Sequence, residues 1–213
     1  MLTESFSHVD YWVFDLDNTL YPPQARLFDQ IEARMIRYVM DALSVNQTEA
    51  KHLCHRYWRD YGTTLAGLMR EHGLKPGPYL NEVHDIDFGC LTPDTALAER
   101  IGTLPGRKIV YTNGCAPYAE RVLNALDLSD LFDAIYGIEH ADFQPKPEPK
   151  AFATIFAKDG LAPDRAAMFE DDPRNLKAPH EMGMCTVLVA PEPAAGDHIH
   201  HYTADLGAFL AQC

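Results

Sequence analysis

The segment Tyr11-Trp12-Val13-Phe14-Asp15-Leu16-Asp17-Asn18-Thr19-Leu20 joins a short apolar run to an acidic loop. The aromatic and β-branched residues 11–14 predict a buried β-strand. Asp15 and Asp17 are two positions apart, so their side chains project to the same side of an extended chain. The segment therefore predicts a strand that delivers two carboxylates to one edge of a sheet.

Strand and helix patterns alternate in the C-terminal part of the chain. Short apolar or β-branched runs predict four more strands, at residues 108–111, 134–136, 166–169 and 185–189. Helical patterns lie between these strands, at about residues 119–126, 149–158 and 174–182. We expect an α/β fold, namely a Rossmann-like parallel sheet of about five strands flanked by helices.

The segment between the first strand and this alternating part carries helical patterns and no strand pattern. Apolar residues recur at helical spacing over residues 26–43, 46–62 and 64–72, and Asn46 with Glu49 forms a capping-box pattern. We expect residues 21–92 to form an all-helical cap inserted after the first strand. Residues 1–20 and 93–213 then form the core domain, with hinges near residues 21–22 and 88–89.

The composition is that of a globular protein with an acidic surface. The chain has 213 residues, of which 46% are hydrophobic, and 18 Lys and Arg against 31 Asp and Glu give a net charge of −13. Such a surface repels nucleic acid, so we expect no DNA or RNA partner. Residues 1–5 lack the pattern of a signal peptide, and no apolar run approaches the roughly 20 residues that span a bilayer. We therefore expect a cytoplasmic protein without a membrane partner.

Polar groups follow the other predicted strands as well. Thr112, Asn113 and Gly114 follow the second strand, Lys146 lies in the loop after the third, and the acidic residues 170–172 follow the fourth. Ligands of open α/β sheets bind beyond the carboxyl ends of the strands. Each motif alone also fits a turn or a helix N-cap. Their coincidence on successive strand ends favours one shared site.

The predicted site has an excess of negative charge that requires a counter-ion. Asp15, Asp17 and residues 170–172 supply five carboxylates, and Lys146 is the cation predicted to lie nearby. Two unit charges about 4 Å apart interact by about 4 kcal/mol at an effective dielectric constant near 20. A divalent cation would relieve this repulsion, and a donor set made only of oxygen favours Mg²⁺.

The parts of the site predict phosphoryl chemistry on a small phosphomonoester. One carboxylate can attack a phosphoryl group and form an aspartyl-phosphate. A second carboxylate can protonate the leaving oxygen and later deprotonate water. Thr112 and Lys146 can hold the phosphoryl oxygens, on which charge spreads in the transition state.

Four segments resemble, in order, the four motifs of the haloacid dehalogenase superfamily: residues 14–20, Thr112-Asn113-Gly114, Lys146-Pro147 and Glu170-Asp171. The resemblance implies a Mg²⁺-dependent hydrolase with a capped Rossmann-like core. It implies that Asp15 is the nucleophile and a metal ligand. It implies that Asp17 is the general acid/base and binds the metal through its backbone carbonyl.

The resemblance assigns the remaining motif residues to phosphate and metal. Thr112 and Lys146 would bind the phosphate, together with Asn113 and Gly114. Asp171 would be the last direct metal ligand, while Glu170 and Asp172 are candidates for indirect support of the metal. The pairing of Asp15 with Asp17 argues against the dehalogenase branch of the superfamily, which lacks the second acid.

Within the superfamily, the chain resembles the pyrimidine 5′-nucleotidases. The resemblance rests on residues 15–22 and on the cap segment Tyr61-Gly62-Thr63-Thr64-Leu65-Ala66-Gly67-Leu68. It implies a 5′-nucleotidase that prefers pyrimidine nucleoside monophosphates, with Tyr21, Tyr61 and Thr64 as candidate substrate contacts. Tyr57 and Trp58 also could stack on a base, but their helical spacing favours a place in the core of the cap.

Two other functions fit the same residues. The first is a phosphatase or phosphomutase for another small phosphometabolite, such as a sugar phosphate. The second is a phospho-acceptor switch or binding module in which Asp15 is phosphorylated without turnover. The large helical insertion after the first strand argues against the switch, because two-component receivers resemble this acid, Thr and Lys arrangement but lack such an insertion.

Overall fold

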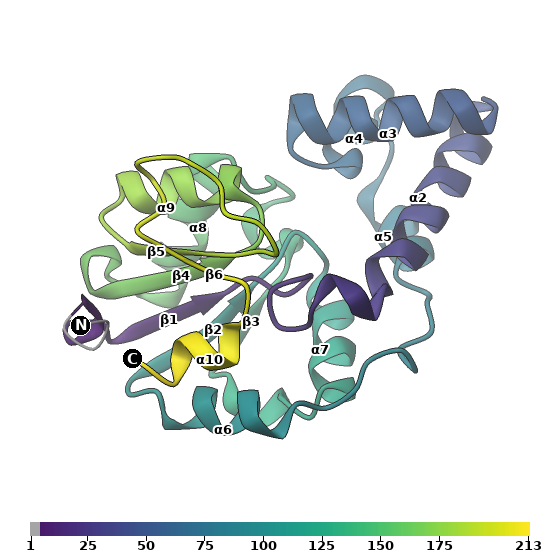
Figure 1. The fold of residues 1–213 in the computed structure, drawn as a ribbon. Helices are drawn as coiled ribbons and strands as arrows, with labels where there is room; N and C mark the ends of the chain where they lie inside the picture. Colours follow the sequence, from purple (N-terminus) through teal and green to yellow (C-terminus); the bar gives the residue numbers. More distant parts are fainter. Residues whose placement is uncertain (1–4) are drawn as a thin grey trace.

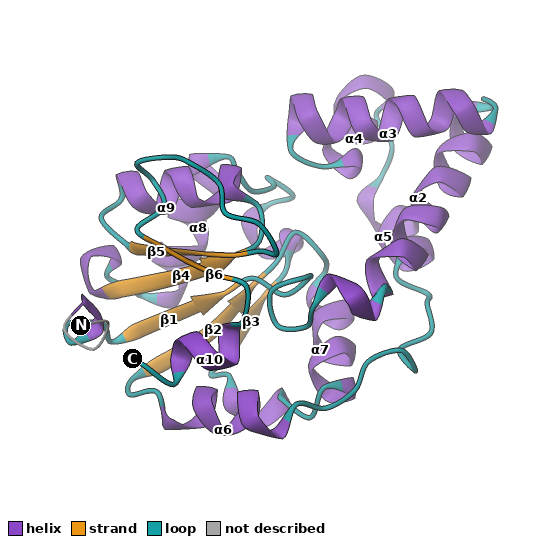
Figure 2. Cartoon of the chain, in the orientation of Figure 1, coloured by secondary structure: helices purple, strands orange, loops and turns teal. Residues whose placement is uncertain are grey.

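In the computed structural model, which describes residues 5–213, β1 lies inside a parallel sheet with the strand order β3-β2-β1-β4-β5-β6 (Figures 1 and 2). The strands are β1 (Tyr11–Phe14), β2 (Arg107–Tyr111), β3 (Ala134–Tyr136), β4 (Ala166–Glu170), β5 (Cys185–Val189) and β6 (His201–Thr203). Every neighbouring pair is parallel. The α/β class and the Rossmann-like sheet predicted from the sequence are therefore confirmed.

Alternate residues of β1 enter two different cores. Trp12 and Phe14 pack into one apolar cluster and Val13 into the other, and all three are almost completely buried. A strand covered on both faces needs a continuous apolar run, which explains the composition of residues 11–14. Helices cover the two faces of the sheet (Figure 1): α6 (Thr95–Thr103), α7 (Ala116–Ala125) and α10 (Leu206–Leu210) on one, α8 (Pro149–Asp159) and α9 (Lys177–Glu181) on the other.

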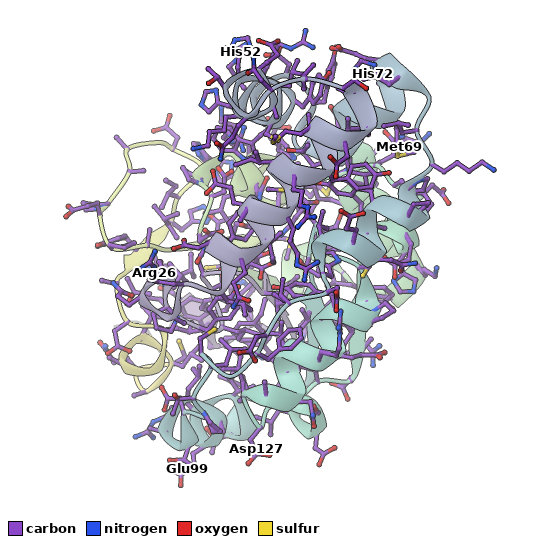
Figure 3. The ribbon with its side chains drawn as sticks, turned by 90° about the vertical axis from the view of Figure 1, so that its right-hand side faces the viewer. Arg26, His52, Met69, His72, Glu99 and Asp127 are labelled. Atoms are coloured by element: carbon purple, nitrogen blue, oxygen red, sulfur yellow. The ribbon has the colours of Figure 1, made fainter. Side chains whose placement is uncertain are left out.

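The cap consists of four helices: α2 (Leu27–Leu43), α3 (Gln47–Tyr61), α4 (Thr64–His72) and α5 (Pro76–Val83). The predicted capping residue is in place, because the Asn46 side chain accepts a hydrogen bond from the Glu49 backbone N–H (3.0 Å). Gly62 ends α3 with a φ of 87°, a conformation that glycine adopts without strain. In Figure 3, His52 and His72 of the cap lie at the opposite end of the molecule from Glu99 and Asp127 of the core.

The sequence prediction of about five strands was one strand short. The sixth strand, β6, has three residues at the sheet edge, and all three side chains are exposed or half-buried. It therefore lacks the apolar pattern by which a strand is found in a sequence. Residues 1–4, on which the expectation about a signal peptide depends, lie outside the described residues. Within residues 5–213, no helix combines the length and the apolar character that crossing a bilayer requires.

Candidate active site

The sheet places its polar residues at one edge because β1 pairs in register with both neighbours. Phe14 is opposite Val110 of β2 and Phe169 of β4, so the residues that follow these strands emerge together. The Asp15 N–H extends the ladder by donating to the Phe169 carbonyl (2.9 Å). Asp15 is therefore held by the backbone of the sheet rather than by a loop.

Lys146 lies at the centre of this edge and is 1% exposed. Its Nζ donates to Asp15 Oδ1 (2.6 Å), to Glu170 Oε2 (2.6 Å) and to the Tyr111 carbonyl (3.1 Å). Glu170 is also 1% exposed and Asp15 is 5% exposed. A buried ammonium thus joins the ends of β1, β2 and β4.

Burial and mutual repulsion perturb the carboxyl groups of this cluster. Burial, with the charge of Glu170, raises the pKa of Asp15 to about 7, although Lys146 opposes the shift. The same two causes raise the pKa of Asp171 to about 10. Burial alone would lower the pKa of Lys146, but the charges of Asp15 and Glu170 outweigh it and raise this pKa. The site therefore retains protons that a cation would displace.

Asp15, Glu170 and Asp171 could together hold a metal ion, because one carboxylate oxygen from each lies within 4.8 Å of the others. Asn18 donates to Asp171 Oδ2 (3.4 Å) and so helps to orient it. Three carboxylates suit a hard cation such as Mg²⁺. This group contains Glu170, which the sequence predicts only as indirect support for the metal.

Asp172 is engaged elsewhere. Its carboxylate accepts hydrogen bonds from the Arg174 guanidinium, the shortest at 2.6 Å, and from the Arg174 backbone N–H (3.0 Å). The Arg174 guanidinium in turn lies over the Trp58 ring of the cap, 3.5 Å from its centroid, and donates to the Trp58 carbonyl (3.3 Å). Asp172 thus belongs to a contact between core and cap.

Asp17 is held by two tyrosines. Its Oδ1 accepts hydrogen bonds from the hydroxyls of Tyr21 and Tyr118, each at 2.5 Å. Burial raises the pKa of Asp17, while the two phenol donors oppose that shift. Tyr21, predicted as a substrate contact, therefore contacts the proposed general acid/base directly.

The segment after β2 is tied to the lysine loop. The Thr112 hydroxyl is buried and accepts from the Gly114 N–H (2.9 Å). The Asn113 side chain exchanges two hydrogen bonds with the Lys146 backbone, donating to its carbonyl (3.1 Å) and accepting from its N–H (2.8 Å). These contacts bring the second and third motifs together, and the phosphate contacts of these residues stay predictions.

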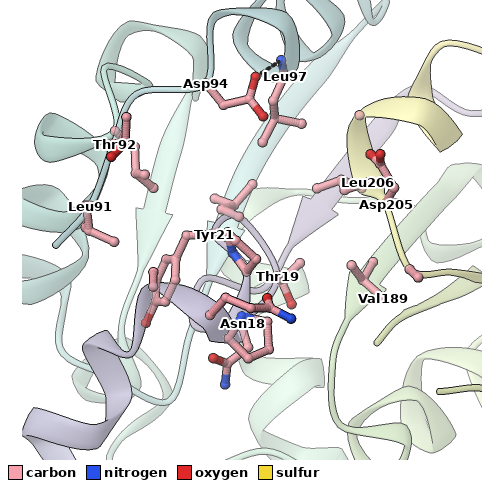
Figure 4. A pocket seen from close by; sticks show the side chains of 18 of the residues that line it. Asn18, Thr19, Tyr21, Leu91, Thr92, Asp94, Leu97, Val189, Asp205 and Leu206 are labelled. Carbon is pink, nitrogen blue, oxygen red and sulfur yellow. Dashed lines mark hydrogen bonds between the residues drawn. The ribbon is translucent and has the colours of Figure 1, made fainter. Parts of the chain in front are cut away.

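Two cavities adjoin the loop that follows β1. The larger, of about 930 Å³, lies between both connections to the cap and the C-terminal segment, and Figure 4 shows Tyr21, Asp94 and Asp205 around it. The smaller, of about 480 Å³, extends from Asp17 into the cap. The smaller cavity is the candidate site, because Asp17 and residues 113–114 line it.

The cap residues divide into those that line this cavity and those that do not. Thr64 lines it, whereas Tyr61 does not and donates instead to Glu71 within the cap (2.9 Å). Tyr57 is fully buried, as its spacing predicted. Trp58 was predicted to be a core residue, which is wrong: it lines the cavity and is 45% exposed. Helical spacing identifies a face of α3, but Trp58 lies at the edge of that face.

Sequence reasoning missed Tyr118 and Arg174. Tyr118 reaches Asp17 from α7, and no motif marked it because its spacing is that of an ordinary core residue. The sequence does contain a signal for the turn that holds Arg174. Asp172-Pro173 predicts an N-cap followed by a proline at the first helical position, which places Arg174 next to the capping carboxylate. The structure has this arrangement, in which Asp172 caps a short 3-10 helix.

The fold and the acidic, lysine-bridged sheet edge define a class of protein, an α/β enzyme whose site lies between its core and a helical cap. The chain belongs to the haloacid dehalogenase-like hydrolase family, whose model matches residues 12–189. The resemblance inferred from the four motifs is thereby confirmed.

One curated protein is similar to this chain in sequence. Phosphate metabolism protein 8 of Saccharomyces cerevisiae is 28% identical over 191 residues, which are 82% of this chain and 60% of that protein. The chain thus spans about 60% of the length of this curated relative.

Solved structures align with nearly the whole chain. CbbY from Rhodobacter sphaeroides, in complex with phosphate, is 17% identical with a TM-score of 0.65, over 95% of this chain and 99% of its own. A HAD phosphatase from Thermococcus onnurineus is 18% identical with a TM-score of 0.61, over 91% and 93%. The HAD-hydrolase YfnB from Bacillus subtilis, bound to magnesium, is 15% identical with a TM-score of 0.60, over 96% and 98%.

Proposed function

We propose that this hydrolase is a Mg²⁺-dependent phosphomonoesterase that works through an aspartyl-phosphate on Asp15. The observation that carries the proposal is the buried Lys146, which contacts both Asp15 and Glu170 at 2.6 Å beside a third carboxylate. A cation and a lysine at the end of β1 are what a phosphoryl group, with its negative oxygens, requires.

The described residues suit each step of this reaction. Asp15, Glu170 and Asp171 would hold Mg²⁺, which supplies positive charge against the phosphoryl oxygens when it is bound. Lys146 adds a fixed positive charge beside Asp15. The Asp15 carboxylate attacks phosphorus while Asp17 gives a proton to the departing oxygen. Asp17 then takes a proton from water, which attacks the aspartyl-phosphate and releases inorganic phosphate.

We propose a nucleoside 5′-monophosphate, with a preference for pyrimidines, as the substrate. The cavity of about 480 Å³ extends from Asp17 along an apolar wall of the cap, and this wall includes Trp58, which is 45% exposed although the Arg174 guanidinium lies over its ring. An aromatic side chain can stack on any base. We further propose that residues 21–92 form the cap that selects the leaving group. We also propose that the enzyme is cytoplasmic.

A phosphate-release screen tests both levels of the proposal. The purified protein is incubated with a panel of nucleoside monophosphates and sugar phosphates, with Mg²⁺ or with EDTA. We expect release that EDTA abolishes and that is fastest for pyrimidine nucleotides. Equal rates over the panel would remove the nucleotide assignment and leave the phosphatase. Interconversion of sugar phosphates without release would indicate a mutase.

The Asp15→Asn variant tests the nucleophile. The replacement keeps the size of the side chain and removes the attacking carboxylate, so we expect phosphate release to fall to background while thermal unfolding remains cooperative. A stable phosphorylated wild-type protein with negligible turnover would instead favour a phospho-acceptor switch. Turnover retained by Asp15→Asn would contradict the role assigned to this residue.

A further inference from the structure

The two tyrosines on Asp17 take up only one of its oxygens. Tyr21 and Tyr118 both donate to Oδ1, each at 2.5 Å. Within residues 5–213, no hydrogen bond reaches the other oxygen, Oδ2. Asp17 lines the cavity of about 480 Å³. The pair of phenols therefore fixes the carboxylate and leaves Oδ2 available to a molecule in the cavity.

Each tyrosine is tied to a different connection between core and cap, because Tyr21 lies on one and Tyr118 packs against the other. Tyr21 lies on the segment that leads from β1 to the first helix of the cap, and it is 2% exposed. Tyr118 lies on α7, where its ring stacks on the His84 imidazole, with centroids 4.2 Å apart and an interplanar angle of 10°. The Phe88 ring lies 6.2 Å from the same ring. Both His84 and Phe88 follow α5 on the segment that returns to the core.

Residues of the core also hold His84 and Phe88 in place against α7. Arg121 of α7 donates to the His84 carbonyl (2.7 Å), and its guanidinium lies 5.1 Å from the Phe88 ring centroid. The His84 ring nitrogen Nδ1 is 3.2 Å from Cys115 Sγ. Burial, with the charge of Arg121, lowers the pKa of His84 to about 4, so the imidazole is neutral near pH 7. Tyr118 therefore packs on a neutral ring of fixed position.

We propose that Tyr21 and Tyr118 are positioning residues that aim Oδ2 of Asp17 at the leaving group. The inference depends on the proposed function, because it concerns proton transfer by Asp17. In that step the bond from phosphorus to the leaving oxygen breaks as the bond from phosphorus to Asp15 forms, and the proton on Oδ2 passes to the leaving oxygen. Because the two phenols are tied to the two connections, the aim of Asp17 depends on the position of the cap.

The leaving group distinguishes this role from a merely structural one. An alkoxide such as the 5′-oxygen of a nucleoside needs a proton in order to leave, and general acid catalysis contributes about 10²–10⁴-fold to such a step. The p-nitrophenolate ion leaves without a proton. A misplaced Asp17 should therefore slow the transfer of the phosphoryl group from a nucleotide to Asp15. It should leave the rate of the same transfer from p-nitrophenyl phosphate nearly unchanged.

The experiment compares kcat/KM for these two substrates in Tyr21→Phe and Tyr118→Phe. Each variant keeps the ring and removes the hydroxyl donor. The matched control is Tyr136→Phe, which removes a phenol hydrogen bond to Asp159 (2.9 Å) outside the cavity. We expect Tyr118→Phe to lose about 10-fold or more on a nucleotide and less than about 3-fold on p-nitrophenyl phosphate. Tyr21→Phe should lose in the same selective way, and the control should match the wild type on both.

The outcomes separate this inference from the proposed function. Equal losses on the two substrates, or no loss in either variant, would overturn the positioning role while the phosphatase stands. A wild-type protein that hydrolyses neither substrate would overturn the proposed function and this inference with it. Thermal unfolding of each variant shows whether a loss of activity comes from misfolding. In that case the ratio of kcat/KM for the nucleotide to kcat/KM for p-nitrophenyl phosphate still tests the positioning role, because both values scale with the same folded fraction.

Discussion

Replacement of Lys146 by methionine tests whether its ammonium stabilises the end of β1. Methionine keeps most of the length and removes the charge, so Asp15 and Glu170 each lose a partner 2.6 Å away. At an effective dielectric constant near 20, one such pair attracts by about 6 kcal/mol. Burial of the ions costs several kcal/mol each, so removal of one partner from a buried pair destabilises by about 3–5 kcal/mol.

The loss should depend on pH, because the orphaned Asp15 carboxylate can take up a proton. Without Lys146, the pKa of Asp15 rises beyond its value of about 7 in the wild type. Below that pKa the carboxyl is neutral and tolerates burial, while above it the protein must bury an unpaired charge. The folded state then binds more protons than the unfolded chain, so the stability of the variant falls as the pH rises. We expect a loss of about 3–5 kcal/mol at pH 8 and less than half of that at pH 5.

Urea unfolding without metal at pH 5 and pH 8 measures both losses. The matched control is Lys108→Met, because the Lys108 Nζ donates to the carbonyls of Leu104 and Gly106 and, among the described residues, makes no hydrogen bond to a carboxylate. We expect the control to change the free energy of unfolding by less than about 1 kcal/mol at either pH. A Lys146→Met protein as stable as the wild type at pH 8, or equally destabilised at both pH values, would refute the reasoning.

Two further predictions concern the metal and the cap. Mg²⁺ should raise the unfolding temperature more at pH 8 than at pH 6. The carboxyl groups of Asp15 and Asp171 have raised pKa values, about 7 and about 10, and must lose protons to bind the ion. Thermal unfolding with and without Mg²⁺ at both pH values measures the two shifts, and a larger shift at pH 6 would contradict the prediction. Gly62→Ala should lower kcat/KM by about 10-fold or more, because the added Cβ would lie 2.8 Å from the Lys146 carbonyl oxygen and push the cap from the core. Gly77→Ala, whose Cβ meets nothing within 4 Å, is the control, and equal rates for the two variants would oppose this explanation.

The sequence predicted the central features of the fold because they follow from strong local patterns. The apolar run 11–14 must be buried on both faces, and the alternation of strands and helices after residue 92 leaves few topologies. The strand ends then place Asp15 and residues 170–171 at one edge without any knowledge of tertiary contacts. The sequence did not predict α5, which begins with Pro76 and Gly77, or β6, which has three residues and no apolar pattern.

The sequence could not predict contacts that depend on side-chain packing between distant segments. Tyr118 reaches Asp17 across 101 positions of the chain, and Arg174 reaches Trp58 across 116. Packing also separates Glu170 from Asp172, because Arg174 takes up the Asp172 carboxylate while an oxygen of Glu170 lies within 4.8 Å of oxygens of Asp15 and Asp171. Such choices are set by distances that no spacing rule contains.

The position of β1 has a consequence for the order in which the chain can fold during synthesis. Tyr11 pairs with Arg107 and with Ala166, so the strand that precedes Asp15 waits for partners made 96 and 155 residues later. At about 5–20 residues per second, the second wait lasts roughly 8–30 s. The helices α2–α5 need only neighbours in sequence and can form first, so a nascent chain would carry a folded cap while Trp12 and Phe14 are still exposed to chaperones and to aggregation.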